Sequence, residues 1–285
     1  MILIADSGST KTDWCMVDGK EKVGAASTQG INPFHQDDEE IQRILHVELK
    51  PKMVDRKVDA VFFYGAGLRQ EMKDRMKGVL EKAFDGVDVE AESDLLGAAR
   101  ALFGRQSGVA CILGTGSNSG LYDGQDIIAN TPPLGYILGD EGSGAVLGKV
   151  FLGALCKGLL PMDLTTAFFQ SSGLDTAAII QAVYRQPLPN RFLASTTRFI
   201  HEHLQVPELR DLVLQNFRLF FQRNLVPYRC QGFKAGADAH GLKVRAVGSI
   251  AYFFCELLTE AAQVEGFSLD LVMQSPMEGL VRFHT

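Results

Sequence analysis

The amino-acid sequence predicts an α/β protein built from two mixed sheets that are flanked by helices. At the amino terminus, three strand-like runs are separated only by turns, and helix-like and strand-like stretches alternate after them. Antiparallel strands followed by such alternation are typical of a mixed sheet with helices on its faces. The succession of strand, small-residue turn and strand begins again at Gly108, which indicates two related halves.

The first half opens on a short apolar run, residues 1–5, which ends in an acid, Asp6. Its length and hydrophobicity predict a buried strand. Further strands are expected at 12–17, 23–27, 58–64 and 87–91, with a hairpin turn at 18–20 and a loop at 28–34. Helices are expected from Asp37 or Asp38 to residue 49, over 69–84 and over 95–103.

The second half repeats this opening and then becomes mostly helical. Strands are expected at 109–113, 121–122, 125–129, 243–247 and 269–273, with turns at 114–120 and 123–124 and a loop at 131–136. Helices are expected over 144–157, over most of 162–231, over 250–264 and from Pro276 onward. Start signals within the helical middle are Asp175, Asn190 and Pro207. The helical spacing of Phe217, Phe220 and Phe221 favours core positions.

Composition excludes several classes of function. The chain has 285 residues, 46% of them hydrophobic and 22% charged, so it can bury sizeable cores in one large or two ordinary domains. The net charge is −6 and Lys and Arg are not clustered, which argues against a nucleic-acid partner. No apolar stretch reaches the length of a membrane span and no signal-peptide pattern is present, so we expect a cytoplasmic location without a membrane partner.

Cysteine usage gives no sign of a metal or disulfide site. The five cysteines, Cys15, Cys111, Cys156, Cys230 and Cys255, are odd in number and widely spaced. None forms a C-x-x-C pair, so neither a disulfide framework nor a zinc or iron–sulfur site is indicated.

The turn that follows the first strand has the composition of a phosphate site. After Asp6 come two serines, Gly8, Thr10 and Lys11. Glycine lets the backbone approach an anion, hydroxyl and amide groups can donate to phosphate oxygens, and an acid can hold magnesium through water. A β-hairpin with a polar turn explains the same residues equally well, since tight turns need small polar residues.

Three other patterns do not meet the requirements of the sites they resemble. Residues 144–149 lack one spacer of a Walker loop, and valine follows the lysine. Residues 114–116 would need a glycine at Ser119 to form a dinucleotide fingerprint. His201 and His203 lie two apart, on different sides of a helix, which favours surface positions.

Acids and small-residue turns follow one another in a fixed order along nearly the whole chain. They are the turn Asp6–Thr10, Asp94 before a small-residue helix, the turn Gly114–Ser117, the helix start Asp140–Gly144 and the turn Gly248–Ser249. This set resembles the sugar kinase, Hsp70 and actin superfamily and, within it, the N-acetylglucosamine kinases of the BadF/BadG/BcrA/BcrD ATPase group. The most specific pieces are residues 6–12, 113–118 and 139–143.

The resemblance implies two ribonuclease H-like domains, the actin-like ATPase fold, closing over a cleft. The amino-terminal domain would span 1–105, and the carboxyl-terminal domain would span 106–274 and include a helical insertion. A last helix, at 275–285, would pack back on the first domain.

The resemblance also implies where ATP, Mg²⁺ and an amino sugar bind. Asp6 would attend the magnesium ion, and ATP would contact Ser9, Thr10, Lys11, Thr115, Gly116, Gly248 and Ser249. The sugar would contact Asn32, Ser117, Asn118, Gly135 and Asp140. Asp94 would be the catalytic base, and the implied activity is ATP-dependent phosphorylation of an amino sugar, N-acetylglucosamine first among the candidates.

Three of these residues have a second explanation. Asp94 is well placed to cap the helix that follows it, and the residues alone favour the cap while the resemblance favours the base. Asp140 has the same ambiguity at its own helix start. Asn32 is also a suitable turn residue before Pro33, although its amide offers the donor and acceptor that a sugar would use.

The chain departs from the animal N-acetylglucosamine kinases at two places. Serines stand in the first turn where those kinases have glycines, and Pro33-Phe34 follows Asn32, so the exact sugar stays open. An ATPase activator of the 2-hydroxyacyl-CoA dehydratase type is disfavoured by the lack of a cysteine pair, and a non-catalytic sugar sensor by the intact set of acids. A homodimer is left open, because the sequence is silent on oligomeric state.

Overall fold

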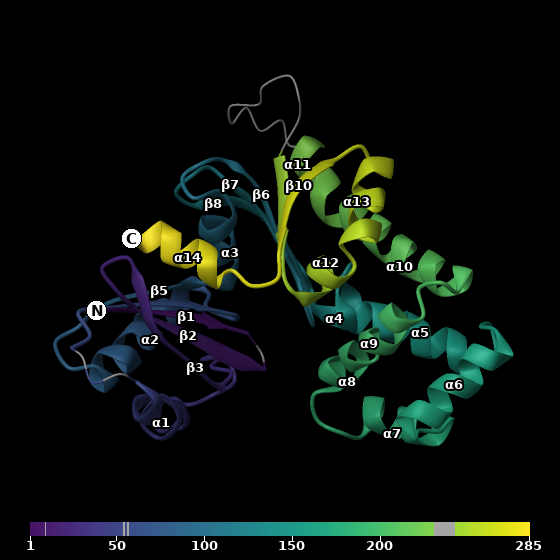
Figure 1. Cartoon of the computed structure of the whole chain (residues 1–285), viewed down its shortest axis with the longest axis horizontal. Coiled ribbons are helices and arrows are strands. Elements are labelled where there is room, and N and C mark those ends of the chain that lie inside the picture. Colours follow the sequence, from purple (N-terminus) through teal and green to yellow (C-terminus); the bar gives the residue numbers. More distant parts are fainter. Residues whose placement is uncertain (9, 54, 56, 231–242) are drawn as a thin grey trace. The chain divides into compact units, whose positions relative to one another are not determined.

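The computed structural model describes residues 1–8, 10–53, 55, 57–230 and 243–285, which form two compact units. Unit 1 comprises Met1–Gln106, Tyr122–Ile127 and Ser275–Thr285, and unit 2 comprises Ser107–Leu121 and Ile128–Gln274. Each contains a five-stranded sheet flanked by helices (Figure 1), which confirms the predicted fold class. Among the described helices, none has the length and hydrophobicity that crossing a lipid bilayer requires.

The sheet of unit 1 is mixed, as expected from its opening strands. Its strands are β1 (Ile2–Ser7), β2 (Lys11–Asp18), β3 (Glu21–Gln29), β4 (Ala60–Gly65) and β5 (Asp88–Ser93). They lie in the order β3-β2-β1-β4-β5, with β1, β2 and β3 antiparallel and β1, β4 and β5 parallel.

Alternate residues of these strands supply two separate cores, because successive side chains of a strand point to opposite faces. One face, with Leu3 and Phe63, packs on α1 (Asp38–Arg43), the π-helical η1 (Ile44–Leu49) and α2 (Gln70–Ala83). The other face, with Ile4 and Tyr64, packs on α3 (Asp94–Phe103) and α14 (Met277–His284). Lys50–Lys52 form a short 3-10 helix, η2, after η1.

The sheet of unit 2 has the same strand order as that of unit 1. Its strands are β6 (Gly108–Leu113), β7 (Ser117–Tyr122), β8 (Ile127–Thr131), β9 (Lys243–Val247) and β10 (Ser268–Met273). The order β8-β7-β6-β9-β10 repeats β3-β2-β1-β4-β5, and β6, β9 and β10 are parallel. The repeat confirms that the chain consists of two related halves.

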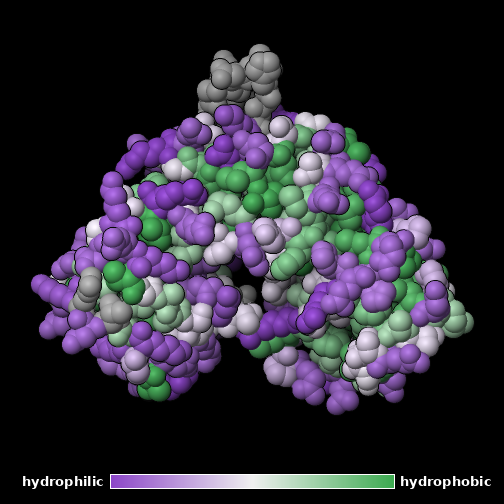
Figure 2. All heavy atoms as spheres, in the orientation of Figure 1, coloured by the Kyte–Doolittle hydropathy of each residue, from purple (hydrophilic) through white to green (hydrophobic). Residues whose placement is uncertain are grey.

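Helices make up the rest of unit 2. They are α4 (Gly135–Leu138), α5 (Gly144–Cys156), α6 (Met162–Ser172), α7 (Thr176–Tyr184), α8 (Pro189–Ser195), α9 (Thr197–Glu202), α10 (Pro207–Phe220), the π-helical η3 (Phe221–Leu225), α11 (Val226–Cys230), α12 (Ser249–Phe253) and α13 (Cys255–Val264). Phe217, Phe220 and Phe221 are buried in one core with α5 and β6, as predicted. In Figure 2, hydrophilic residues cover much of the visible surface, and hydrophobic residues lie between them.

Several predicted boundaries are wrong. The turn at 114–120 is shorter, because β7 already begins at Ser117, and a short helix occupies part of the loop at 131–136. The helix at 250–264 is broken at Phe254, which separates α12 from α13. Helix α8 begins at Pro189 and not at Asn190, after Leu188 in a left-handed conformation. The expected helical stretch ends at Gln231, which lies outside the described residues.

Candidate functional site

Two acids lie at the carboxyl edge of the parallel strands of unit 1. Asp6 pairs with Tyr64 of β4 near the end of β1, and Asp94 comes directly after β5. Alternation along β1 puts Asp6 on the same face as Ile4, the face covered by α3, and Asp94 is the first residue of that helix. In open α/β sheets, ligands bind at this edge of the sheet.

The two carboxyl groups influence each other. Burial and the negative charges of Asp94 and Asp13 together raise the pKa of Asp6 to about 7, although Lys11 lowers it in part. Burial also raises the pKa of Asp94, although a hydrogen bond from the N–H of Leu95 lowers it in part. Carboxyl groups that share a confined space and repel each other are frequent at functional sites.

Helix α3 is capped by Ser93 and not by Asp94. The Ser93 side chain accepts a hydrogen bond from the N–H of Leu96 at 3.2 Å, the geometry of an N-cap. Asp94 lies one residue later and accepts from Leu95 at 2.8 Å. The prediction that Asp94 caps this helix is therefore wrong, because Ser93 provides the cap.

The turn between β1 and β2 is described apart from Ser9, which lies outside the described residues. The N–H of Gly8 donates to the carbonyl of Lys11 at 3.0 Å, and Thr10 is exposed. The ammonium group of Lys11 lies 2.7 Å from the carboxylate of Asp13. Lys11 is thus engaged with a neighbouring acid on its own strand.

Two buried hydroxyl groups flank this turn, Ser7 at the end of β1 and Thr12 near the start of β2, a role that the sequence reasoning missed. The oxygens of Ser7 and Thr12 are 2.6 Å apart, and Ser7 donates to the carbonyl of Ile31 at 2.8 Å. The N–H of Ile31 in turn contacts the Ser7 oxygen at 3.0 Å. The buried pair thereby ties the acid-led turn to the segment that carries Asn32.

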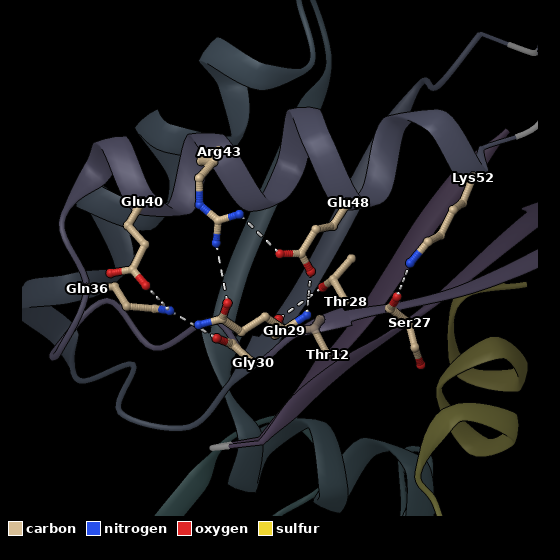
Figure 3. A network of polar contacts seen from close by, with 10 residues as sticks. All are labelled: Thr12, Ser27, Thr28, Gln29, Gly30, Gln36, Glu40, Arg43, Glu48 and Lys52. Carbon is tan, nitrogen blue, oxygen red and sulfur yellow. Dashed lines mark hydrogen bonds and ion pairs between the residues drawn. The ribbon is translucent and has the colours of Figure 1, made fainter. Parts of the chain in front are cut away.

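The segment that leads to Asn32 is also held from outside. Figure 3 shows Gln29 bonded to side chains of α1 and η1, including Glu48 at 2.9 Å, and Gly30 bonded at 3.2 Å to Gln36, which precedes α1. The side-chain oxygen of Asn32 accepts a hydrogen bond from the N–H of Phe34 at 3.0 Å. Asn32 therefore acts as a turn residue, which is one of the two roles that the sequence allowed. It lies against Gly67, where a side chain would come within 2.5 Å of the Asn32 oxygen.

The equivalent edge of unit 2 carries two glycine turns side by side, because β6 and β9 are adjacent parallel strands. Gly248 has φ 123°, a conformation that favours glycine, and an added Cβ would lie 2.3 Å from the carbonyl oxygen of Leu113. Ser249, the first residue of α12, is exposed.

The turn after β6 is anchored to the start of α5. The N–H groups of Gly144 and Ala145 donate to the carbonyls of Gly114 and Thr115 at 2.8 and 3.0 Å. Three of the predicted sugar residues follow here or nearby. Ser117 is buried and donates to the carbonyl of Glu141 at 2.7 Å, Asn118 accepts from Asn130 at 2.9 Å, and Gly135 begins α4.

Asp140 has an unusual backbone conformation for a residue with a side chain. Its φ is 54°, and its carboxylate accepts hydrogen bonds from the N–H groups of Gly135 and Ser117. Burial raises the pKa of Asp140 and these hydrogen bonds lower it, and the resulting pKa is about 6. A Cβ on Gly116 would lie 3.0 Å from the Asp140 oxygen, so a side chain there would require the carboxylate to shift. The helix start that the sequence offered as its alternative role belongs to Ser143, the N-cap of α5.

The predicted residues are divided between the two units. Asp6, Asn32 and Asp94 lie in unit 1, as do Thr10 and Lys11. The unit 2 group comprises Thr115, Gly116, Ser117, Asn118, Gly135, Asp140, Gly248 and Ser249. Sequence reasoning missed Glu141, which is buried, although it stands inside the G-D-E-G-S-G motif that drew attention to Asp140.

The acids of unit 1 suit a magnesium ion that is held mainly by phosphate and water. Within the described residues, no group of three or more His, Cys, Asp or Glu side chains forms a ready cation cage. Magnesium in phosphoryl-transfer sites needs only one or two carboxylates besides the substrate phosphates. A cation would also relieve the repulsion between Asp6 and Asp94 that accompanies the raised pKa of Asp6.

Comparisons with known proteins place this architecture among sugar kinases. A solved structure from Porphyromonas gingivalis, described as a putative N-acetylglucosamine kinase, is 47% identical, with a TM-score of 0.94 over 100% of this chain and 98% of that one. A protein from Chromobacterium violaceum with the same description is 18% identical (TM-score 0.75, 100% and 98% covered). A ROK family glucokinase from Streptomyces griseus, in complex with glucose and AMPPNP, is 14% identical (TM-score 0.59, 99% and 97% covered). The last two show the fold alone. Family models and curated sequences give no match.

Proposed function

The chain belongs to the same family as the Porphyromonas gingivalis protein, and on this premise we propose that it is an ATP-dependent kinase that phosphorylates an amino sugar. N-acetylglucosamine is the expected substrate. The observation that carries the proposal is the 47% identity over the full length of both chains. The pair of acids at the sheet edge of unit 1 and the paired glycine turns at the equivalent edge of unit 2 suit the transfer of a phosphoryl group.

ATP is assigned to the turns of both units. Ser9, Thr10 and Lys11 would contact the phosphates from unit 1, and Thr115 and Gly116 would contact them from unit 2. Gly248 and Ser249 would contact the adenosine. The support is that glycine turns let the backbone come close to phosphate oxygens, and that Gly248 has a φ of 123°, a conformation that favours glycine.

Asp6 is assigned to the magnesium ion that accompanies ATP. The ion supplies positive charge that neutralises the phosphate oxygens as the terminal phosphoryl group is transferred. In support, Asp6 is a partly buried acid next to a second acid, so a bound cation would stabilise its ionised form.

The sugar is assigned to five polar residues: Asn32, Ser117, Asn118, Gly135 and Asp140. Amide, hydroxyl and carboxylate groups offer the mixture of donors and acceptors that sugar hydroxyls and an N-acetyl group require. Asp140 suits this role best, since its carboxylate is oriented by two backbone N–H groups. Which amino sugar binds depends on how these groups match its substituent.

Asp94 is assigned as the base. A sugar hydroxyl oxygen forms a bond to the γ-phosphorus while the bond from that phosphorus to the β,γ-bridging oxygen breaks and ADP leaves. Asp94 accepts the hydroxyl proton, and such general-base assistance is typically worth about 10²–10⁴-fold in rate. The support is that Ser93 already caps α3, so the cap does not account for Asp94.

Three broader assignments accompany this function. The first is membership of the BadF/BadG/BcrA/BcrD ATPase group, to which the order of motifs points. The second takes residues 1–105 with 275–285, and 106–274, as the two ribonuclease H-like domains. The third is a cytoplasmic location, where ATP and free amino sugars are both available.

The direct test is a coupled ADP-release assay on the purified protein with a panel of sugars. The panel contains N-acetylglucosamine, glucosamine, N-acetylmannosamine and plain hexoses, each with and without MgCl₂. We expect Mg²⁺-dependent ADP release that is fastest with N-acetylglucosamine. ADP release that is independent of every sugar would contradict a sugar kinase and favour an ATPase with another partner.

A further inference from the structure

The loop that carries Asp140 is held by one long helix of unit 2. Helix α10 continues into η3, and side chains from both contact the three residues that follow Asp140. The φ of 54° at Asp140 is unfavourable for a residue with a Cβ, and such conformations persist only when the surroundings determine them. These contacts therefore explain how the conformation is kept.

Asn216 of α10 binds the backbone of the loop at two places. Its side-chain oxygen accepts from the N–H of Gly142 at 3.0 Å, and its side-chain nitrogen donates to the carbonyl of Ser143 at 3.3 Å. Asn216 is only 4% exposed, so these bonds replace water on both sides. A single carboxamide thus fixes two consecutive residues, Gly142 and Ser143, behind Asp140.

Glu141, the residue next to Asp140, is bound by η3. One carboxylate oxygen accepts from Arg223 at 2.7 Å, and the other accepts from Asn224 at 3.4 Å. Burial alone would raise the pKa of Glu141, but the hydrogen bonds from Arg223 and Asn224 outweigh it and hold the pKa below its ordinary value. The Glu141 carboxylate is therefore a charged anchor.

Glu141 also connects this anchor to the sugar residues. Its carbonyl accepts the hydroxyl proton of Ser117 at 2.7 Å, and the N–H of Ser117 donates to the Asp140 carboxylate. Asn216 and Arg223 lie seven residues apart, two helical turns, on the side of the helix that contacts the loop. Helical segments of the π type, such as η3, are frequent at functional sites.

We propose that Asn216 and Arg223 are positioning residues, which hold Asp140 through Gly142 and Glu141 in the conformation that binds the sugar. The inference rests on the proposed function, in which Asp140 contacts the sugar. Neither side chain touches a substrate in this role. Their loss misplaces a hydrogen-bonding carboxylate and leaves the nucleotide turns as they are.

The first test compares two arginine variants in the amino-sugar kinase assay. Arg223→Met removes the charge and keeps the length of a side chain that is 62% exposed, so the protein should still fold. We expect its KM for N-acetylglucosamine to rise about tenfold or more, since small displacements of binding groups are costly, with an unchanged KM for ATP. Arg223→Lys, which keeps a positive charge, should recover part of the loss.

Arg210→Met is the matched control. Arg210 lies on the same helix α10 and forms an ion pair with Glu260, away from the loop. Its loss should leave the KM for N-acetylglucosamine unchanged. An active Arg223→Met enzyme with an unchanged sugar KM would overturn the proposal, as would an equal rise in Arg210→Met.

The second test needs no activity and separates this proposal from the kinase assignment. Amide hydrogen exchange over residues 139–143, read by mass spectrometry, should be faster in Arg223→Met and in Asn216→Ala than in the wild type and Arg210→Met. Unchanged exchange in the first two variants would overturn the proposal. A wild-type protein that phosphorylates no sugar would contradict the kinase assignment instead, and the exchange comparison would still decide the role of Arg223.

Discussion

The hydroxyl group of Tyr64 lies 2.8 Å from Nε2 of His284 and so joins β4 to the last turn of α14. The ring of His284 also stacks on Phe62, with centroids 3.8 Å apart. Arg100 of α3 donates to the same Tyr64 hydroxyl at 2.8 Å. The final helix is thereby bound to the strand beside β1, which carries Asp6.

This contact predicts a pH dependence of stability. Burial and the charge of Arg100 together lower the pKa of His284 to about 4, although the charge of Glu90 raises it in part. The unfolded value is about 6.5, so between the two values the unfolded state binds more protons, and unfolding becomes harder as pH rises. Stability from this group is present above pH 6.5 or so and is lost as pH falls toward 4, a change of roughly 1–2 kcal/mol after allowance for partial exposure.

The measurement is urea unfolding at pH values from 4 to 8. His284→Gln keeps an amide for Tyr64 and should flatten the profile in this range relative to the wild type. The surface variant His46→Gln controls for the loss of a histidine in the same unit. Identical slopes in all three proteins would refute the prediction.

Asp94→Asn should lower turnover by about 10²–10⁴-fold, because an amide cannot accept the sugar proton. Affinity for AMPPNP, measured by calorimetry, should stay nearly the same. Ser93→Ala should show the reverse pattern, since the lost N-cap costs about 1 kcal/mol of stability without removing the base. Full activity of Asp94→Asn would return this residue to a structural role.

Gly248→Ala should destabilise unit 2 severely. An alanine there would need an unfavourable φ and would bring its Cβ within 2.3 Å of the Leu113 carbonyl oxygen. Gly153→Ala is the matched control, because Gly153 lies in the exposed part of α5 with open space around it. The Gly153→Ala variant should have a free energy of unfolding that is higher by about 0.5–1 kcal/mol, because alanine loses less conformational entropy than glycine when the helix forms. Denaturant midpoints for both variants check the contrast.

Much of the fold could be predicted where local signals decide the structure. Asp37 does cap α1, the turn after Asp18 does join β2 to β3, and residues 243–247 form the strand that their apolar pattern indicates. The break at Phe254 could not be foreseen, because no Gly or Pro marks it. The Phe254 ring packs on Phe217 and His201, which are distant in sequence.

In the candidate site, too, the features with a local sequence signal could be predicted and the long-range contacts could not. The acids and glycine turns stand at strand ends, where composition indicates them, and alternation along β1 sends Asp6 and Ser7 to opposite faces. The supporting contacts have no local signal. Asn216 meets Gly142 across 74 residues of sequence, and Arg223 meets Glu141 across 82, so only the folded chain reveals them.

Asp6→Asn should remove the effect of magnesium on nucleotide binding. In the wild type a cation offsets the repulsion between Asp6 and Asp94, so AMPPNP with MgCl₂ should raise the Tm more than AMPPNP with EDTA. Asn carries no charge, so in the variant the two conditions should give nearly equal Tm values. Asp85→Asn, a change at an exposed acid of the same unit, should keep the full difference. A difference that survives in Asp6→Asn would move the magnesium assignment to another carboxylate.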